Sequence, residues 1–178
     1  MDDPKDYSTI SIRTDRILLQ TITEDYTEEI FREFNAEITT YMHPAPAQDM
    51  EETLRFIQVS MERMRVGQNI LTVILSPDGD QFLGCAGLHQ PHTQTPELGI
   101  WLKKAAQGNA YGKEAIHALK AWADQHLNYK YLLYPVDKNN YASRRIPESF
   151  NAKIGRSYQD KSMDGRLLNI LEYRILPG

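Results

Sequence analysis

The sequence has 178 residues, of which 41% are hydrophobic and 25% charged, a composition typical of one soluble globular domain. Its single cysteine, Cys85, excludes an internal disulfide and a cysteine-based zinc module. No stretch approaches 18 consecutive apolar residues, and the first residues are acidic where a signal peptide is basic and then apolar. We therefore expect a cytoplasmic protein that does not insert into a membrane.

Charge is unevenly distributed along the chain. Residues 1–60 carry thirteen acidic and five basic residues, whereas residues 101–178 carry seven acidic and thirteen basic ones. If both ends border one cleft, its acidic side suits a cationic group and its basic side an anionic one. The alternative is that these charges are scattered over solvated faces. The net charge of −4 argues against a nucleic-acid partner.

In the first half of the chain, the apolar pattern predicts one strand region and two helices. Apolar residues alternate with polar ones from Ile10 to Thr21, which predicts a strand interrupted near residues 14–15. Residues 23–35 change to helical spacing, with Thr23 as the expected cap. After Pro44 and Pro46, residues 49–66 predict a second helix with an apolar stripe of Leu54, Ile57, Met61 and Met64.

The second half of the chain mixes short strands with two helices. Strands are predicted at residues 70–75, 82–88, 96–102, 131–136, 157–159 and 167–176, and helices at residues 111–127 and 140–154. Pro147 has to lie near the start of the last helix or kink it. This order predicts an α/β (α+β) fold: a mixed, mostly antiparallel sheet of about seven strands with helices on both faces. We expect one domain over residues 8–178 after a frayed segment, residues 1–7.

The segment between the strand at 96–102 and the helix at 111–127 is a candidate anion site. The first N–H groups of a helix lack intrahelical partners, and the helix dipole adds positive charge there. Gly108 and Gly112 remove side chains where a diphosphate would approach. The alternative interpretation is that these glycines only form a turn.

Read with its neighbours, this segment resembles a known family. The run Gln107-Gly108-Asn109-Ala110-Tyr111-Gly112 resembles the acetyl-coenzyme A loop of the GCN5-related N-acetyltransferases (GNAT), Gln/Arg-x-x-Gly-x-Gly/Ala. Its continuation through Lys113, the Asn-x-x-Ser segment from Asn140 to Ser143 and the first strand are similar to the branch containing the ribosomal-protein N-terminal alanine acetyltransferases. The resemblance spans about residues 8–176. Ala110 departs from the usual glycine, so a positive φ there would strain the loop.

The resemblance implies the same fold and a set of cofactor-binding residues. In the family, the strands corresponding to 96–102 and 131–136 splay apart, and the pantetheine arm pairs with exposed backbone in the gap. The implied cofactor is acetyl-coenzyme A as acetyl donor, with no metal, and the implied contacts are Ile100, Trp101, Leu102, Gln107, Gly108, Asn109, Ala110, Tyr111, Gly112, Lys113, Asn140 and Ser143.

Two residues are candidates for the base that accepts the amine proton. An N-terminal α-amine has a pKa near 8 and needs less help than a lysine near 10.4. Glu97 is the first candidate, because the resemblance places the start of its strand beside the substrate amine; the alternative is an exposed strand-end residue. His89 is the second. A metal site at His89 and His92 lacks a third ligand.

Ser143 is the candidate donor for the departing thiolate, because its position matches a residue that lies near the cofactor sulfur in this branch. The alternative is a serine in the first turn that caps the helix. Asn140 is either the cap or a pantetheine contact. Tyr134 and Tyr141 supply further hydroxyls in the same region.

These features predict an N-acetyltransferase that passes the acetyl group directly to a primary amine. The acceptor is a protein N-terminal α-amine or a small cationic amine. The alternative is a non-catalytic acyl-coenzyme A-binding module of the same fold, and a third possibility is that the glycine loop is only a turn. The chain is expected to act as a monomer or homodimer.

Overall fold

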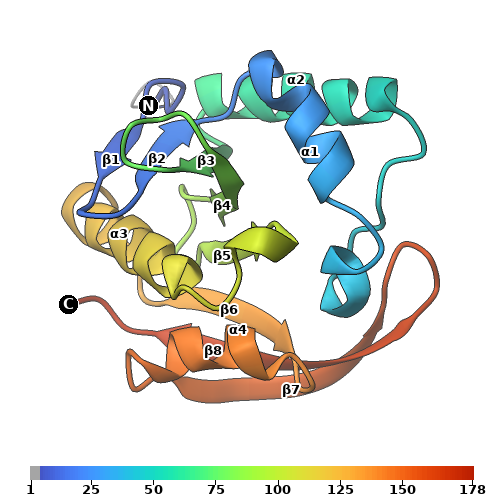
Figure 1. Ribbon diagram of the computed structural model, residues 1–178. Coiled ribbons are helices and arrows are strands. Elements are labelled where there is room, and N and C mark those ends of the chain that lie inside the picture. The colour runs from blue at the N-terminus through green and yellow to red at the C-terminus, as the bar shows by residue number, and fades with distance from the viewer. Residues whose placement is uncertain (1–4) are drawn as a thin grey trace.

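The computed structural model describes residues 5–178, and these build one eight-stranded sheet in the order β1-β2-β3-β4-β5-β6-β8-β7 (Figure 1). Only β5 and β6 run parallel. The strands are β1 (Ser11–Arg13), β2 (Leu18–Thr21), β3 (Asn69–Leu75), β4 (Phe82–His89), β5 (Glu97–Leu102), β6 (Leu132–Asp137), β7 (Lys153–Lys161) and β8 (Leu167–Ile175). The predicted mixed, mostly antiparallel sheet is confirmed. It has one strand more than expected, because the interrupted first strand is a hairpin of β1 and β2.

The helices are α1 (Thr27–Glu33), α2 (Met50–Arg65), α3 (Tyr111–His126) and α4 (Tyr141–Glu148), with 3-10 turns η1 (Glu24–Tyr26), η2 (Ile38–Tyr41) and η3 (Lys104–Ala106). Asp49 caps α2 by accepting a hydrogen bond from the Glu52 N–H. Thr23 does not cap the backbone as expected: its hydroxyl donates to Asp25, and η1 precedes α1.

Helices cover both faces of the sheet (Figure 1). The side chains of successive strand residues point to opposite faces, so the contacts of β5 show which helices cover each face. Trp101 packs against Phe34, at the end of α1, with ring centroids 4.9 Å apart. On either side of it, Ile100 and Leu102 lie 3.5–3.6 Å from where a Cβ on Gly112 of α3 would be. The α1–α2 layer and the α3–α4 layer therefore lie on opposite faces.

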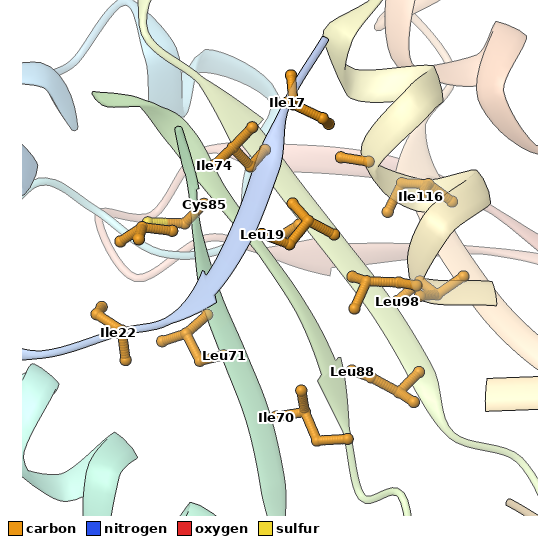
Figure 2. Close-up of a cluster of buried hydrophobic side chains, with 14 of the residues drawn as sticks. Ile17, Leu19, Ile22, Ile70, Leu71, Ile74, Cys85, Leu88, Leu98 and Ile116 are labelled. Carbon is orange, nitrogen blue, oxygen red and sulfur yellow. The ribbon is translucent and has the colours of Figure 1, made fainter. Parts of the chain in front are cut away.

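The core fills the space between these layers (Figure 2). On the α3 face, side chains from β2, β3, β4 and β5 meet Ile116 of α3, and all are buried. Full burial of such a side chain stabilises the fold by about 1.5–3 kcal/mol. The fully buried residues there include Ile17, Leu19, Ile70, Ile74, Leu88 and Leu98.

Two predicted boundaries are wrong. Helix α4 ends at Glu148, not at residue 154, because Pro147 has no N–H for the carbonyl of Ser143 and Asn151 turns the chain with a φ of +55°. Strand β7 is longer than residues 157–159, since pairing with β8 forms it and its mostly exposed side chains show no alternation.

The N-terminal segment also differs from expectation where the structure describes it. Residues 1–4 of the predicted frayed segment lie outside the described residues. Tyr7, in contrast, is buried: its ring packs edge-on against Trp122, and its N–H donates to the carbonyl of Met64. Lys5 donates from Nζ to the carbonyl of His126. These contacts hold residues 5–7 against the domain.

Candidate active site

The turn before α3 presents a row of backbone donors. The Gln107 N–H is used by the carbonyl of Lys104, and the Asn109 side-chain amide donates to the carbonyls of Ala106 and Gln107. Within residues 5–178, nothing accepts a hydrogen bond from the backbone N–H groups of residues 108–113. Because the α3 dipole points its positive end at the same place, the turn is suited to an anion.

The conformation of this turn depends on two residues with positive φ. Gly108 has a φ of +82° and Ala110, the N-cap of α3, a φ of +60°. Ala110 therefore takes the left-handed conformation at which the sequence analysis expected strain. For an L-residue this conformation costs roughly 1–2 kcal/mol.

Strands β5 and β6 diverge immediately after they meet. Their only paired residues are Glu97 and Leu133, and the Leu133 N–H donates to the carbonyl of Pro96. The Lys103 N–H, in contrast, donates to Leu83 of β4. Since the polar groups of successive residues alternate between the two edges of a strand, those of Ile100 and Leu102 face the gap.

A cavity of about 410 Å³ connects this gap to the α3 turn. Ten of the twelve predicted cofactor contacts line it, whereas Asn109 and Tyr111 do not; the ten are Ile100, Trp101, Leu102, Gln107, Gly108, Ala110, Gly112, Lys113, Asn140 and Ser143. Sequence reasoning missed five more lining residues, Ile38, Met42, Ala142, Arg145 and Ile146. These residues lie on α4 or in and after η2, far from the α3 turn in sequence, so only the folded chain brings them to the cavity.

The residues of this cavity fit an acyl-coenzyme A. Nothing lies within 4 Å of where a Cβ on Gly108 would be, so an anion can approach the free N–H groups. Lys113 and Arg145 add positive charge beside them, and no ion pair engages either residue within the described chain. Lys104, by contrast, pairs with Glu37 at 2.6 Å. The walls toward β5 are apolar, as a pantetheine arm requires.

Two hydroxyl groups meet at the wall formed by α4 and β6. Ser143 Oγ lies 2.8 Å from the Tyr134 hydroxyl oxygen, and the Ser143 N–H donates to Asn140 Oδ1 at 3.2 Å. Asn140 is therefore the helix cap, which was one of the two roles predicted for it. Burial raises the pKa of Tyr134, so its hydroxyl stays protonated. Tyr141 points elsewhere and is 67% exposed.

A second cavity, of about 300 Å³, opens on the other face of the sheet and shares Met42, Ile100 and Trp101 with the first. Its floor consists of small residues from β4 and β5, and its walls come from α1, α2, the loop at 42–47 and the β7–β8 turn. The lining side chains are mainly apolar, including Ile30, Phe31, Phe34, Phe56, Cys85 and Met163. Glu52, Thr53 and His89 are its polar exceptions.

His89 faces this second cavity. Its Nδ1 lies 2.9 Å from Asn69 Oδ1, and its Nε2 lies 3.3 Å from where a Cβ on Gly99 would be. An Nδ1–H donating to Asn69 leaves Nε2 as a free acceptor above the β5 backbone. Burial and the positive charge of Arg63 lower the pKa of His89, so the neutral ring is favoured.

Glu97 is paired with His89 across β4 and β5 and shares its face of the sheet, but it lines neither of these cavities. Burial and the negative charge of Glu172 raise the pKa of Glu97, and Arg156 opposes that shift. The structure thus brings His89 and Ser143 to cavities that meet at β5, and leaves Glu97 at the start of that strand.

The remaining candidates for reactive chemistry, a cysteine thiol and a metal site, receive no support. Cys85 is buried in the floor of the second cavity, and burial raises the pKa of its thiol. Over residues 5–178, His, Cys, Asp and Glu side chains form no cluster of three suited to a metal ion. Over the same residues, no helix is both long and apolar enough to cross a membrane.

Comparison with known families gives a direct assignment. The family described as "Acetyltransferase (GNAT) domain" matches residues 16–153, which is most of the chain. The chain belongs to the GNAT acetyltransferase family. The predicted family and its acyltransferase activity are thereby confirmed. No curated protein matches the chain.

Solved structures share the fold at low sequence identity. A putative acetyltransferase from T. thermophilus is 20% identical, with a TM-score of 0.78, over 94% of this chain and 89% of its own. RimL, a ribosomal L7/L12 α-N-protein acetyltransferase in complex with coenzyme A, is 15% identical, with a TM-score of 0.84, over 94% and 98%. An acetyltransferase from Salmonella typhimurium, which modifies the N-terminal serine of ribosomal protein L7/L12, is 14% identical, with a TM-score of 0.81, over 94% and 99%. This GNAT enzyme therefore has the fold predicted for it.

Proposed function

We propose that this GNAT enzyme transfers the acetyl group of acetyl-coenzyme A directly to the N-terminal α-amine of a polypeptide. One observation carries the proposal: the free N–H groups of residues 108–113 open onto a cavity that reaches the edge of β5 where this strand no longer pairs with β6. A second cavity meets the first at Ile100 and Trp101, so the acetyl donor and the amine can reach the same part of β5 from the two cavities. Residues 8–178 are proposed to form one catalytic domain.

The first cavity is proposed to hold the acetyl donor, which supplies an activated thioester when bound. The backbone of residues 108–112 would bind the diphosphate, with Lys113 and Arg145 adding charge. The β5 edge at Ile100 and Leu102 would pair with the amide groups of the pantetheine arm. Asn140 contributes indirectly, since it fixes the first turn of α4.

His89 is proposed to accept the proton from the amine. Its Nε2 faces the second cavity without a partner among residues 5–178, and the neutral ring can accept a proton directly or through water. Glu97 is the weaker candidate on this geometry, because it lines neither cavity. An α-amine with a pKa near 8 requires only modest help from such a base.

The Tyr134–Ser143 pair is proposed to stabilise the departing thiolate. If the Tyr134 hydroxyl donates to Ser143 Oγ, the Ser143 hydroxyl hydrogen is free to point into the first cavity. A hydroxyl donor there offsets developing negative charge on sulfur. The raised pKa of Tyr134 favours this direction, because the tyrosine remains a donor.

The second predicted acceptor class, a small cationic amine, receives less support. Of the eleven acidic residues in the described range 5–60, only Glu52 lines the second cavity, and its Oε2 already accepts the Gln48 N–H at 2.7 Å. Several positive charges would be poorly solvated in this cavity. We also propose a cytoplasmic location and an active monomer, since one chain supplies both cavities.

The test is free-thiol release from acetyl-coenzyme A in the presence of peptide amines. We expect release that depends on the amine, that falls about 100-fold in His89→Gln, and that falls about tenfold in Ser143→Ala. Glu97→Gln serves as the comparison for the base and is expected to have the smaller effect. Tight coenzyme A binding without release by any amine would support the non-catalytic module instead.

A further inference from the structure

We infer that the walls of the second cavity select the acceptor and that the acceptor peptide begins with a bulky apolar residue. The inference rests on the proposed function, because it treats this cavity as the site of the amine. The cavity of about 300 Å³ lies at the lower end of the range for ligand sites, which suits one side chain rather than a folded segment.

The polar residues of the cavity are His89 and, on the α2 wall, Thr53 and Glu52, whose Oε2 already accepts the Gln48 N–H. His89 lies at the floor, where Gly87 and Gly99 add no side chains and leave space above β4 and β5. If the α-amine of the acceptor lies at His89 Nε2, the side chain of its first residue faces Phe31, Phe34 and Trp101. A polar side chain such as serine would lose its water there without gaining partners.

Hydrogen bonds fix the backbone of the turn that carries Met163. The Met163 N–H donates to the carbonyl of His43 at 2.8 Å, which joins the β7–β8 turn to the loop at 42–47. Arg166 strengthens this junction by donating from Nη1 to the carbonyl of Thr39 at 2.7 Å. These hydrogen bonds hold the β7–β8 turn beside the segment at 39–47, so the backbone that carries Met163 is a built part of the cavity wall.

The mouth of the cavity favours a peptide over a free small amine. Phe56 is 55% exposed and Met163 is 68% exposed, although both line the cavity. A small aromatic amine held at His89 would fill the interior and leave these outer surfaces in water. A polypeptide that continues out of the cavity can cover them with its second and third residues.

The first residue inferred for the acceptor differs from that of one enzyme with a similar fold. The Salmonella typhimurium enzyme modifies an N-terminal serine, at 14% identity to this chain. An apolar cavity predicts a different first residue here, such as Phe, Leu or Met. The specificity would arise because an apolar first side chain contacts the walls of the second cavity and a serine side chain does not.

The test uses lysine-free peptides that differ only at the first residue, with thiol release and the mass of the acetylated peptide as readouts. We expect kcat/KM for Phe, Leu or Met to exceed that for Ser, Gly or Asp by about tenfold or more. Phe56→Ala is expected to lower kcat/KM for the Phe peptide by about tenfold, while the KM for acetyl-coenzyme A stays unchanged. Val59→Ala is the matched control, because Val59 is 52% exposed on the same helix and lies outside the cavity lining.

The outcomes distinguish a failure of this inference from a failure of the proposed function. Release that is equal for all first residues, or faster for Ser or Asp, would overturn this inference and leave the proposed function standing. Faster acetylation of phenethylamine than of the Phe peptide would also overturn it, in favour of a small apolar amine. If no amine of any kind supports release, the proposed function fails, and this inference fails with it. A Phe56→Ala enzyme with unchanged coenzyme A binding shows that loss of folding is not the cause.

Discussion

Ala110 and Gly108 form the turn before α3, and both have positive φ. The two residues differ in what that conformation costs. Glycine adopts it freely, whereas alanine is strained by contacts of its Cβ. The free N–H groups depend on this turn, so the strain at Ala110 is located where the proposed diphosphate binds.

Replacing Ala110 with glycine should relieve this strain. We expect Ala110→Gly to raise the free energy of unfolding by about 0.5–1 kcal/mol, because the relief exceeds the added entropy of the unfolded chain. Gly108→Ala is the converse control, since no atom lies within 4 Å of its new Cβ and only conformation changes. Urea titration measures both. Destabilisation by Ala110→Gly would contradict the account of this turn.

His89 sets the pH dependence expected for the reaction. Its pKa is lowered, so the neutral base is lost only when the pH falls below the ordinary histidine value of about 6.5. We expect an acidic limb in kcat/KM with its midpoint below that value, and we expect His89→Gln to abolish it. The separate change in kcat/KM near pH 8, which follows deprotonation of the acceptor α-amine, should remain. An acidic limb that is unchanged in His89→Gln would exclude His89 as the base.

The same shift makes a prediction for stability. A histidine with a lowered folded-state pKa binds its proton more readily in the unfolded chain, so protonation favours unfolding. The His89 contribution to stability is therefore present above about pH 6.5 and is lost as the pH falls toward the folded-state pKa. His89→Gln should flatten the stability profile over that window, as measured by urea unfolding at several pH values.

At the scale of elements, β5 does the most to organise the site. It pairs along its length with β4 and at one position with β6, and it separates the two cavities. Gly84 of β4 allows the close approach, because a Cβ there would lie 2.1 Å from the carbonyl oxygen of Trp101. That clash involves backbone, which cannot rotate away.

Gly84→Ala should therefore displace β5 from β4. We expect a loss of about 3 kcal/mol in the free energy of unfolding, at the upper end for overpacking, together with weaker coenzyme A binding. Gly79→Ala, in the β3–β4 turn, has open space around its new Cβ but a φ of +85°. It is expected to cost about 1 kcal/mol and to leave binding intact. Equal effects of the two substitutions would show that the β4–β5 approach is not tight.

The sequence predicted some elements better than others for physical reasons. Helix α2 was predicted from an apolar stripe that follows Pro44 and Pro46, and α3 from a periodic run, because local signals determine both. The exposed strand β7 carries no apolar alternation and forms only by pairing with β8, so its ends, residues 153–156 and 160–161, were not predicted as strand. Arg145 and Met163 lie far from the α3 turn in sequence, and only the folded chain brings them to the cavities. The divergence of β5 and β6 was expected solely from the family resemblance.

At the scale of the whole molecule, the acidic N-terminal third contributes one carboxylate, Glu52, to the second cavity within the residues that the structure describes. Most of the carboxylates in residues 5–60 are exposed, and several pair with basic residues, as Glu51 does with Arg55. The basic C-terminal part does contribute to the first cavity, through Lys113 and Arg145. The alternative of scattered, solvated charge thus describes the acidic third better than a cationic acceptor does.

Coenzyme A should stabilise the entire fold, because the residues proposed to bind it come from β5, α3 and α4 together. At a concentration of about 100 Kd, binding to the native state alone adds about 2.7 kcal/mol, which for a chain of this size raises Tm by roughly 5–10 °C. Pantetheine lacks the diphosphate and should raise Tm much less. Equal protection by pantetheine would indicate that the α3 turn does not bind the diphosphate. Differential scanning calorimetry measures both shifts.

The most direct test of the account is a crystal structure of the protein with coenzyme A. The account predicts diphosphate oxygens within about 3 Å of several backbone nitrogens in residues 108–113, and the pantetheine arm along Ile100 and Leu102. A complex in which coenzyme A binds elsewhere, while those nitrogens keep only water as partners, would contradict it.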